Sequence, residues 1–163
     1  MNEATWLLMQ EILKRVTWPE ALALDVGSFD INGTYRPLIE GRGWRYIGLD
    51  IQIGPNVDVM TEPFHYPFAD KTFDIILSGA VMEHVTAIWN WVPELVRVLK
   101  LGGLLAIVTH WNFQEHRYPV DCWRILPDGM RYLFDLVGQL DNYIIKIANN
   151  TDIVGSAFRK WAE

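Results

Sequence analysis

The fold is decided by the stretch ALALDVGS, residues 21–28. An apolar run that ends in an acidic residue, a glycine and a small polar residue is typical of a buried strand that leads into a ligand-binding loop. Similar apolar runs, each bounded by turn-forming residues, follow it at Arg45–Ile51, Val57–Met60, Phe73–Gly79 and Leu104–His110. We predict that residues 21–27 and these four runs are strands.

Helical patterns lie beside these strands. We predict helices over residues 2–16, with Asn2 as the cap, over residues 80–89, and over residues 92–100. The last of these is expected to stop at Leu101-Gly102-Gly103, because glycine just past the final turn ends many helices. Strands that alternate with helices predict a parallel sheet with helices on both faces.

The C-terminal part has a different pattern. A helix is predicted from Pro127 to about Val137, followed by β-rich runs at residues 143–148 and 153–159. The short polar connection between these runs predicts an antiparallel hairpin. The fold class is therefore α/β, with a mostly parallel seven-stranded sheet that closes in this hairpin.

The second and third strands present a conflict. Only about six residues separate them, whereas parallel neighbours need a crossover of about a dozen or more. We expect either a vestigial third strand or a lost helix.

Composition limits the class of protein. The chain has 163 residues, half of them apolar, and we interpret residues 1–163 as one domain with an N-terminal helix in 1–18 and a core in 20–160. No apolar stretch is long enough for a membrane span or a signal peptide, so we expect a cytoplasmic protein. Cys122 is the one cysteine, and the net charge of −6 makes nucleic acid an improbable partner.

Two acidic strand ends indicate the ligand. Asp25 precedes Gly27 at the end of the first strand, and Asp50 ends the second strand. A carboxylate in the position of Asp50 accepts hydrogen bonds from a ribose diol, so the pair indicates a nucleoside-containing ligand. The alternatives are a turn that needs Gly27 for its backbone angles and a helix cap or surface charge at Asp50.

Five segments in order carry a family resemblance. They are Asp25-x-Gly27, Gly48-Leu49-Asp50, residues 66–74 (YPFADKTFD), Glu83-His84-Val85 and Leu99–Gly103. Residues 20–160 thereby resemble class I S-adenosylmethionine-dependent methyltransferases, and most closely the small-molecule branch that includes ubiquinone/menaquinone-biosynthesis-type enzymes. The resemblance implies a Rossmann-like fold, S-adenosyl-L-methionine as cofactor and S-adenosyl-L-homocysteine as product.

The resemblance also implies contacts of single residues with the cofactor. The loop of Asp25, Gly27 and Ser28 would wrap the methionine part, Asp50 would bind the ribose and Ile51 would flank the adenine. Thr61 or Glu62 would reach the adenine amino group, and Ser78 and Gly79 would contact the methionine part by their backbone. Phe29 and Ile31 stand where the family has glycines, so the loop must approach the cofactor differently.

The acceptor side is expected around two histidines. His84 follows the fourth strand and His116 follows the fifth, and a histidine is suited to remove a proton from a hydroxyl acceptor. The alternative for His84 is a packing role. The acceptor wall is predicted from residues in the segment after the fifth strand: Trp111, Tyr118, Asp121, Trp123 and Arg124. Alternatively, an Arg124–Asp121 pair and tryptophan packing only pin this segment.

Other chemistries fit the sequence less well. We expect no metal site, because tetrahedral sites have ligands spaced more tightly than these histidines and acids. Ser78-Gly79-Ala80-Val81 lacks the prolines of DNA adenine methyltransferases, and Cys122 lacks the context of a cytosine methyltransferase nucleophile. A nicotinamide-dependent oxidoreductase would need glycines at Phe29 and Ile31 to bind a pyrophosphate.

One further alternative remains beside a small-molecule methyltransferase. A catalytically degenerate module would keep the fold and bind only a cofactor or a partner. In either case the chain leaves little length for a substrate lid, so we expect an open pocket or one completed by a homodimer or another partner.

Overall fold

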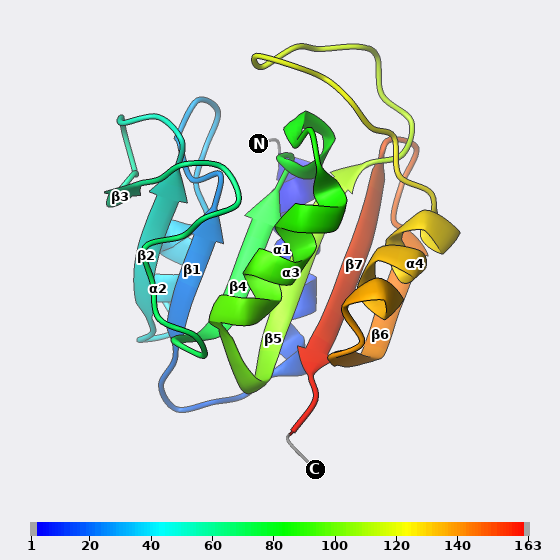
Figure 1. Ribbon diagram of the computed structural model, residues 1–163. Helices are drawn as coiled ribbons and strands as arrows, with labels where there is room; N and C mark the ends of the chain where they lie inside the picture. Colours follow the sequence, from blue (N-terminus) through cyan, green and yellow to red (C-terminus); the bar gives the residue numbers. More distant parts are fainter. Residues whose placement is uncertain (1–2, 162–163) are drawn as a thin grey trace.

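The computed structural model describes residues 3–161, which contain a seven-stranded sheet of order β3-β2-β1-β4-β5-β7-β6 (Figure 1). The strands are β1 (Leu22–Val26), β2 (Arg45–Asp50), β3 (Val59–Met60), β4 (Phe73–Gly79), β5 (Leu99–His110), β6 (Leu140–Ile147) and β7 (Asp152–Arg159). The first five run parallel, and β7 pairs antiparallel with β5 and with β6. The predicted fold class and the closing hairpin are confirmed.

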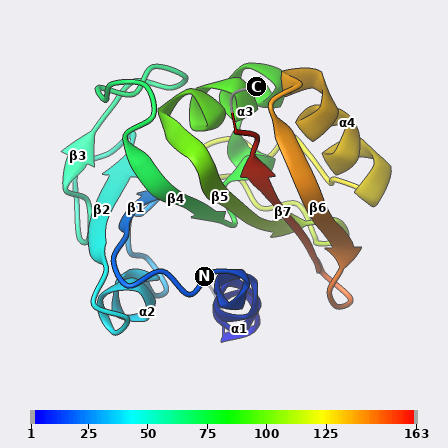
Figure 2. The ribbon, with the colours of Figure 1, turned by 90° about the horizontal axis from the view of Figure 1, so that it is seen from below.

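Helices cover both faces of the sheet. α1 (Glu3–Ile12), continued by η1 (Leu13–Arg15), and α2 (Arg36–Glu40) lie on one face, whereas α3 (Ile88–Val98) and α4 (Pro127–Val137) lie on the other (Figure 2). The α4 bounds match the prediction, and the opening helix is confirmed over residues 3–15; its expected cap, Asn2, lies outside the described residues. None of the helices in residues 3–161 has the length and apolar character of a membrane span.

The central strands bury side chains on both faces. In β4, Ile75 and Leu77 join the apolar cluster beneath α1 and α2, while Ile76 joins the cluster beneath α3 and α4. Because successive side chains of a strand point to opposite faces, continuous apolar runs fill both clusters at once. The middle of the sheet is therefore filled by apolar side chains on both faces.

The short connection between β2 and β3 lacks a helix, and β3 is also vestigial, so both expectations for this region are confirmed. Residues 51–58 form no helix, and β3 has two residues that pair with Leu49 and Asp50. The backbone N–H of Asp58 donates to the carbonyl of Gly48 at 2.9 Å, and the Asp58 carboxylate accepts the N–H of Gly48 at 2.7 Å. These bonds hold the loop against β2 without a crossover helix.

The predicted helix over residues 80–89 is wrong. Ala80 has a φ of 55°, and only the single turn η2 (Met82–His84) forms before α3 begins. The carbonyl of Glu83 accepts the N–H groups of Cys122 at 2.7 Å and Trp123 at 3.3 Å. The segment after β5 thus takes the hydrogen bond that a continuing helix would have made.

The predicted end of the next helix is also wrong. α3 ends at Val98, and Leu99 is extended and begins β5, so Gly102 and Gly103 lie within the strand. The guanidinium of Arg159 on β7 donates to the carbonyls of Val96 and Leu99. A buried cation from a distant strand therefore satisfies the end of α3 in place of a glycine cap.

We expect Arg159→Met to lower the free energy of unfolding by about 2 kcal/mol, because buried carbonyls lose a charged donor. Urea denaturation followed by circular dichroism measures the change. Arg131→Met, at an exposed position of α4, is the control and should stay within about 0.5 kcal/mol of the wild type. Equal stability of both variants would show that Arg159 does not cap the helix.

Candidate active site

A cavity of about 900 Å³ opens at the carboxyl ends of β1, β2 and β4. This is the edge where open α/β sheets bind ligands. Seven of the residues predicted to contact a cofactor line it: Asp25, Gly27, Ser28, Asp50, Ile51, Thr61 and Gly79. Glu62 and Ser78 lie outside the lining. The hydroxyl of Ser78 instead donates to the carbonyl of Val26 at 2.7 Å, and Glu62 is exposed.

The loop after β1 is tied to the end of β2. The N–H groups of Gly27 and Ser28 both donate to the carbonyl of Leu49, at 2.9 and 3.1 Å. Gly27 has a φ of +82°, and a Cβ there would lie 2.1 Å from the Val81 side chain. A glycine is thus required at this position, both for its backbone conformation and for the close approach of Val81.

The residues that replace the family's glycines are accommodated by the neighbouring loop. A Cβ at Gly54 would lie 2.0 Å from the ring of Phe29, so this ring packs directly against the backbone of residues 51–58. The N–H of Phe29 donates to Asp50. Ile31 is about half exposed and lines the cavity, and Gly33 follows it in a turn closed by Asp30 at 2.7 Å.

Asp50 is held with its carboxylate at the cavity. One oxygen accepts the N–H of Phe29 at 3.0 Å, and the other accepts the N–H of Gln52 at 3.1 Å. Each oxygen keeps a further lone pair for another donor. Two ligand hydroxyls can therefore be bound side by side.

Tyr46 connects to Asp25 in a buried network that the sequence did not indicate. The phenol donates to Asp25 at 2.5 Å and accepts from the amide of Asn56 at 2.8 Å, while the guanidinium of Arg36 lies 4.2 Å from the ring centre. Burial raises the pKa of Asp25 to about 7, and the hydrogen bond from Tyr46 opposes that rise. Asp25 thus changes charge near neutral pH.

The segment after β5 lies over this end of the sheet (Figure 1), and four of its predicted wall residues anchor it. Arg124 grips Asp121 through two hydrogen bonds of 2.6 and 2.7 Å, which lowers the pKa of Asp121. The indole of Trp123 donates to the carbonyl of Val85, and the indole of Trp111 donates to that of Asn149. None of these four lines the cavity within the described chain. The placement favours the pinning alternative for them.

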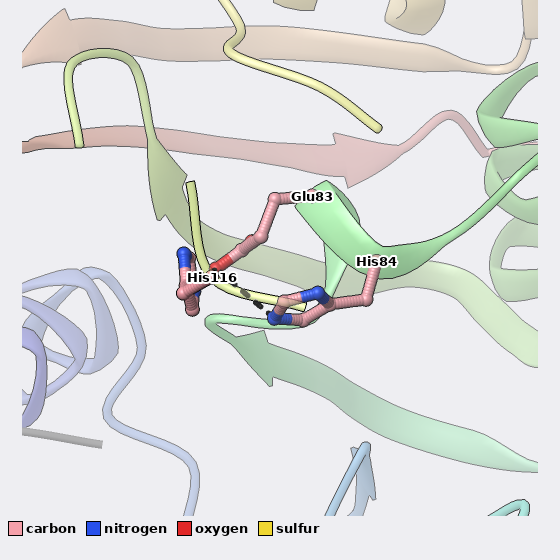
Figure 3. Close-up of side chains that lie close together, drawn as sticks. All are labelled: Glu83, His84 and His116. Atoms are coloured by element: carbon pink, nitrogen blue, oxygen red, sulfur yellow. Dashed lines mark ion pairs between the residues drawn. The ribbon is translucent and has the colours of Figure 1, made fainter. Parts of the chain in front are cut away.

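Tyr118 and His116 do line the cavity, and His116 joins His84 and His110 around Glu83. Figure 3 shows the Glu83 carboxylate, carried on η2, extending toward the rings of His84 and His116. Glu83 is fully buried. Glu83 and His110 were not among the predicted site residues, although both lie where β4 and β5 end on one edge of the sheet.

A family model described as a methyltransferase domain matches residues 24–107, which is half of the chain. The chain belongs to this methyltransferase domain family. Over 98 residues it is 35% identical to an uncharacterized methyltransferase from Mycobacterium leprae (strain TN). The aligned part covers 53% of this chain and 36% of that relative. The methyltransferase domain therefore spans about a third of the length of this curated relative.

Solved structures share the fold along nearly all of the domain. A SAM-dependent methyltransferase from Aquifex aeolicus has a TM-score of 0.73 at 18% identity, covering 97% of this chain and 94% of its own. The YcgJ protein from Bacillus subtilis has a TM-score of 0.75 at 16% identity, covering 99% and 100%. The methyltransferase domain thus has the class I fold.

We expect Tyr46→Phe to raise the pKa of Asp25 above the wild-type value of about 7, because a hydrogen bond to the ionised carboxylate is lost. Carbon-13 NMR of the Asp25 carboxyl group measures this pKa.

The raised pKa of Asp25 also predicts how stability depends on pH. The folded wild type holds the Asp25 proton more tightly than the unfolded chain, whose aspartates titrate at about pH 4. Asp25 should therefore make stability fall as pH rises from about 4 to 7.

Tyr132→Phe is the matched control, since Tyr132 is exposed on α4. It should leave the titration of Asp25 unchanged. An Asp25 pKa near its ordinary value in the wild type would contradict the assigned environment.

Proposed function

We propose that the domain transfers a methyl group from S-adenosylmethionine to a small-molecule acceptor. The observation that carries this proposal is the Asp50 carboxylate, held by two backbone amides at the carboxyl edge of a class I methyltransferase sheet. Its free lone pairs suit a ribose diol. The resemblance to the small-molecule branch supports the acceptor class.

The cavity fits such a cofactor in size and in chemistry. Its volume of about 900 Å³ is within the usual range for small-molecule sites, about 300–1,000 Å³. We assign Asp25, Gly27, Ser28 and Gly79 to the methionine part, Asp50 to the ribose, and Ile51 with Thr61 to the adenine. A Cβ at Gly79 would lie 2.0 Å from the Tyr35 hydroxyl, so the close packing of Tyr35 against the end of β4 requires glycine here.

When bound, the cofactor supplies a methyl group already activated by a sulfonium, so the protein must mainly align the acceptor. We assign Tyr118, His84 and His116 to the acceptor side. Nδ1 of His84 lies 2.6 Å from the carbonyl of Val120, which can only accept, so Nε2 carries the lone pair. That nitrogen is suited to remove a proton from a hydroxyl acceptor.

The acceptor wall is proposed to be preformed by the anchored segment after β5. Trp111, Asp121, Trp123 and Arg124 then position Tyr118 and His116 without contacting the acceptor themselves. On the cofactor side, we likewise propose that Glu62 and Ser78 position the residues that contact the cofactor without contacting it themselves.

We also propose that a second subunit or another protein covers the rim of the cavity. Ile31 and Ile51 line the cavity and are 52% and 48% exposed, which leaves apolar surface beside the ligand. A structural neighbour, with a TM-score of 0.72 at 17% identity, was solved as a complex with the Trm112 methyltransferase activator of Haloferax volcanii. Light scattering during turnover tests the proposal, and full activity as an isolated monomer would contradict it.

We expect Asp50→Asn to weaken the binding of S-adenosylmethionine and S-adenosylhomocysteine about 10- to 100-fold, because an amide replaces the charged acceptor of the ribose hydroxyls. Calorimetric titration of the purified chain measures both affinities. Asp128→Asn, at the exposed start of α4, is the control and should bind both as the wild type does.

Parallel titration with NAD and a methyl-transfer assay complete the test. Absence of sulfur-nucleoside binding by the wild type, or binding of NAD instead, would overturn the proposal. Cofactor binding without transfer to any member of a broad panel of hydroxyl, amine and carbon acceptors would favour the degenerate module.

A further inference from the structure

Four side chains converge on one point at the cavity wall. From Oε1 of Glu83, the Nε2 atoms lie at 3.3 Å for His110, 3.9 Å for His116 and 4.0 Å for His84. Glu83, His84 and His116 each offer a ligand atom, and these three atoms all lie within 4.8 Å of one another. Three of the four histidines of the chain thus surround a single carboxylate oxygen.

The Nδ1 atom of each of these three histidines lies beside a hydrogen-bond acceptor. Nδ1 of His84 faces the carbonyl of Val120 at 2.6 Å, and Nδ1 of His116 faces that of Gln114 at 3.1 Å. Nδ1 of His110 faces the carboxylate of Asp152 at 2.9 Å. Acceptors at Nδ1 place the proton there, so each neutral ring directs the lone pair of Nε2 toward Glu83.

The carboxylate at the centre is incompletely satisfied. Oε2 of Glu83 accepts a hydrogen bond from Thr109 at 2.7 Å, whereas Oε1 has no hydrogen-bond partner within residues 3–161. Glu83 is fully buried, so this oxygen is also withheld from bulk water. A buried anion that faces three nitrogen lone pairs is unfavourable unless a cation lies between them.

We propose that Glu83, His84 and His116 bind a divalent transition-metal ion of the zinc type, with the fourth coordination position left open. Zinc holds nitrogen and oxygen ligands at about 2.0–2.1 Å, which places tetrahedral ligand atoms about 3.4 Å apart. The Nε2 atoms of His84 and His116 lie 4.0 and 3.9 Å from Oε1 of Glu83, so each must approach this oxygen by about half an ångström. The two imidazole ligands favour zinc, iron, copper or nickel over magnesium or calcium.

The hydrogen bonds around the cluster support the assignment. Histidines that bind a metal usually donate their second nitrogen to a carboxylate or a backbone carbonyl, which fixes the ring and its tautomer. Gln114 and Val120 supply such acceptors to His116 and His84, and Asp152 supplies one to the neighbouring His110. Asp152 is itself held by the amide of Asn149 at 2.8 Å.

The ion would face the ligand cavity, because His84, His110 and His116 all line it. In its open fourth position the ion would bind an acceptor oxygen and lower the pKa of that hydroxyl, so that the proton leaves to solvent and Nε2 of His84 is not needed as a base. The inference therefore goes beyond methyl transfer. Metal binding rests on the ligand geometry alone and can be tested without any turnover.

The test is a calorimetric titration of the full chain with Zn²⁺ after dialysis against a chelator. We expect one ion per chain, with an affinity reduced more than about tenfold in His116→Ala and in Glu83→Gln, since even outer hydrogen-bond partners of a metal site contribute that much. His65→Ala is the matched control, because His65 is exposed and lies outside the cluster. It should bind Zn²⁺ as the wild type does.

Two further measurements make the result specific. Cys122→Ser should retain the ion, which excludes the exposed thiol as its ligand, and Co²⁺ should give the visible absorption of a protein-bound ion that His116→Ala loses. His116 lies in a partly exposed segment, so this variant tests the site even where Glu83→Gln unfolds.

Asp50→Asn separates metal binding from the proposed function, since this variant should bind Zn²⁺ as the wild type does while binding the sulfur nucleosides about 10- to 100-fold more weakly. Less than one ion per chain in the wild type, unchanged binding in His116→Ala, or equal loss in His65→Ala would each overturn the metal site.

Discussion

Burial of β1, β4 and β5 on both faces is the constraint on which the rest of this molecule depends. Side chains in the middle of these strands are apolar because both faces are buried, as at Ile75, Ile76 and Leu77. Hydrogen-bonding and ionisable groups are excluded from the middle and collect where the parallel strands end. Asp25, Asp50, Glu83 and His110 lie at that edge for this reason, although they are far apart in the sequence.

The domain keeps this arrangement with few helices around it. Residues 51–58 and the connection from β3 to β4 form no helix, and the loop after β2 is held by Asp58 and by the ring of Phe29 against Gly54. The binding edge is thus built from backbone hydrogen bonds and close packing. It does not require the usual crossover helices, which explains how a sheet of this type fits into a short chain.

Local patterns predicted the sheet well because they report which residues are buried. The five parallel strands, α4 and the hairpin follow from apolar runs and turn residues. The ends of the two helices predicted after β4 could not be predicted from these patterns. Glu83 makes its backbone bonds to Cys122 and Trp123, and Arg159 satisfies the end of α3; both partners come from distant parts of the chain. Single-segment patterns carry no information about such contacts.

The candidate site divides in the same way. Asp25, Gly27 and Asp50 were predicted because they lie at the ends of β1 and β2. The convergence of His84, His110 and His116 on Glu83 depends instead on how two loops fold over one another. Trp111, Asp121, Trp123 and Arg124 have the composition of a binding surface but anchor the segment that carries Tyr118. Residue type alone does not distinguish residues that line the cavity from residues that anchor the segment after β5.

The elevated pKa of Asp25 has a consequence for energetics. A carboxyl group that titrates near pH 7 is divided between its acidic and basic forms at neutrality. Any positively charged group that settles beside it favours the ionised form and drives the proton into the buffer. Ligand uptake at this edge then becomes a proton-exchange reaction, whose observed heat depends on the ionisation enthalpy of the buffer chosen.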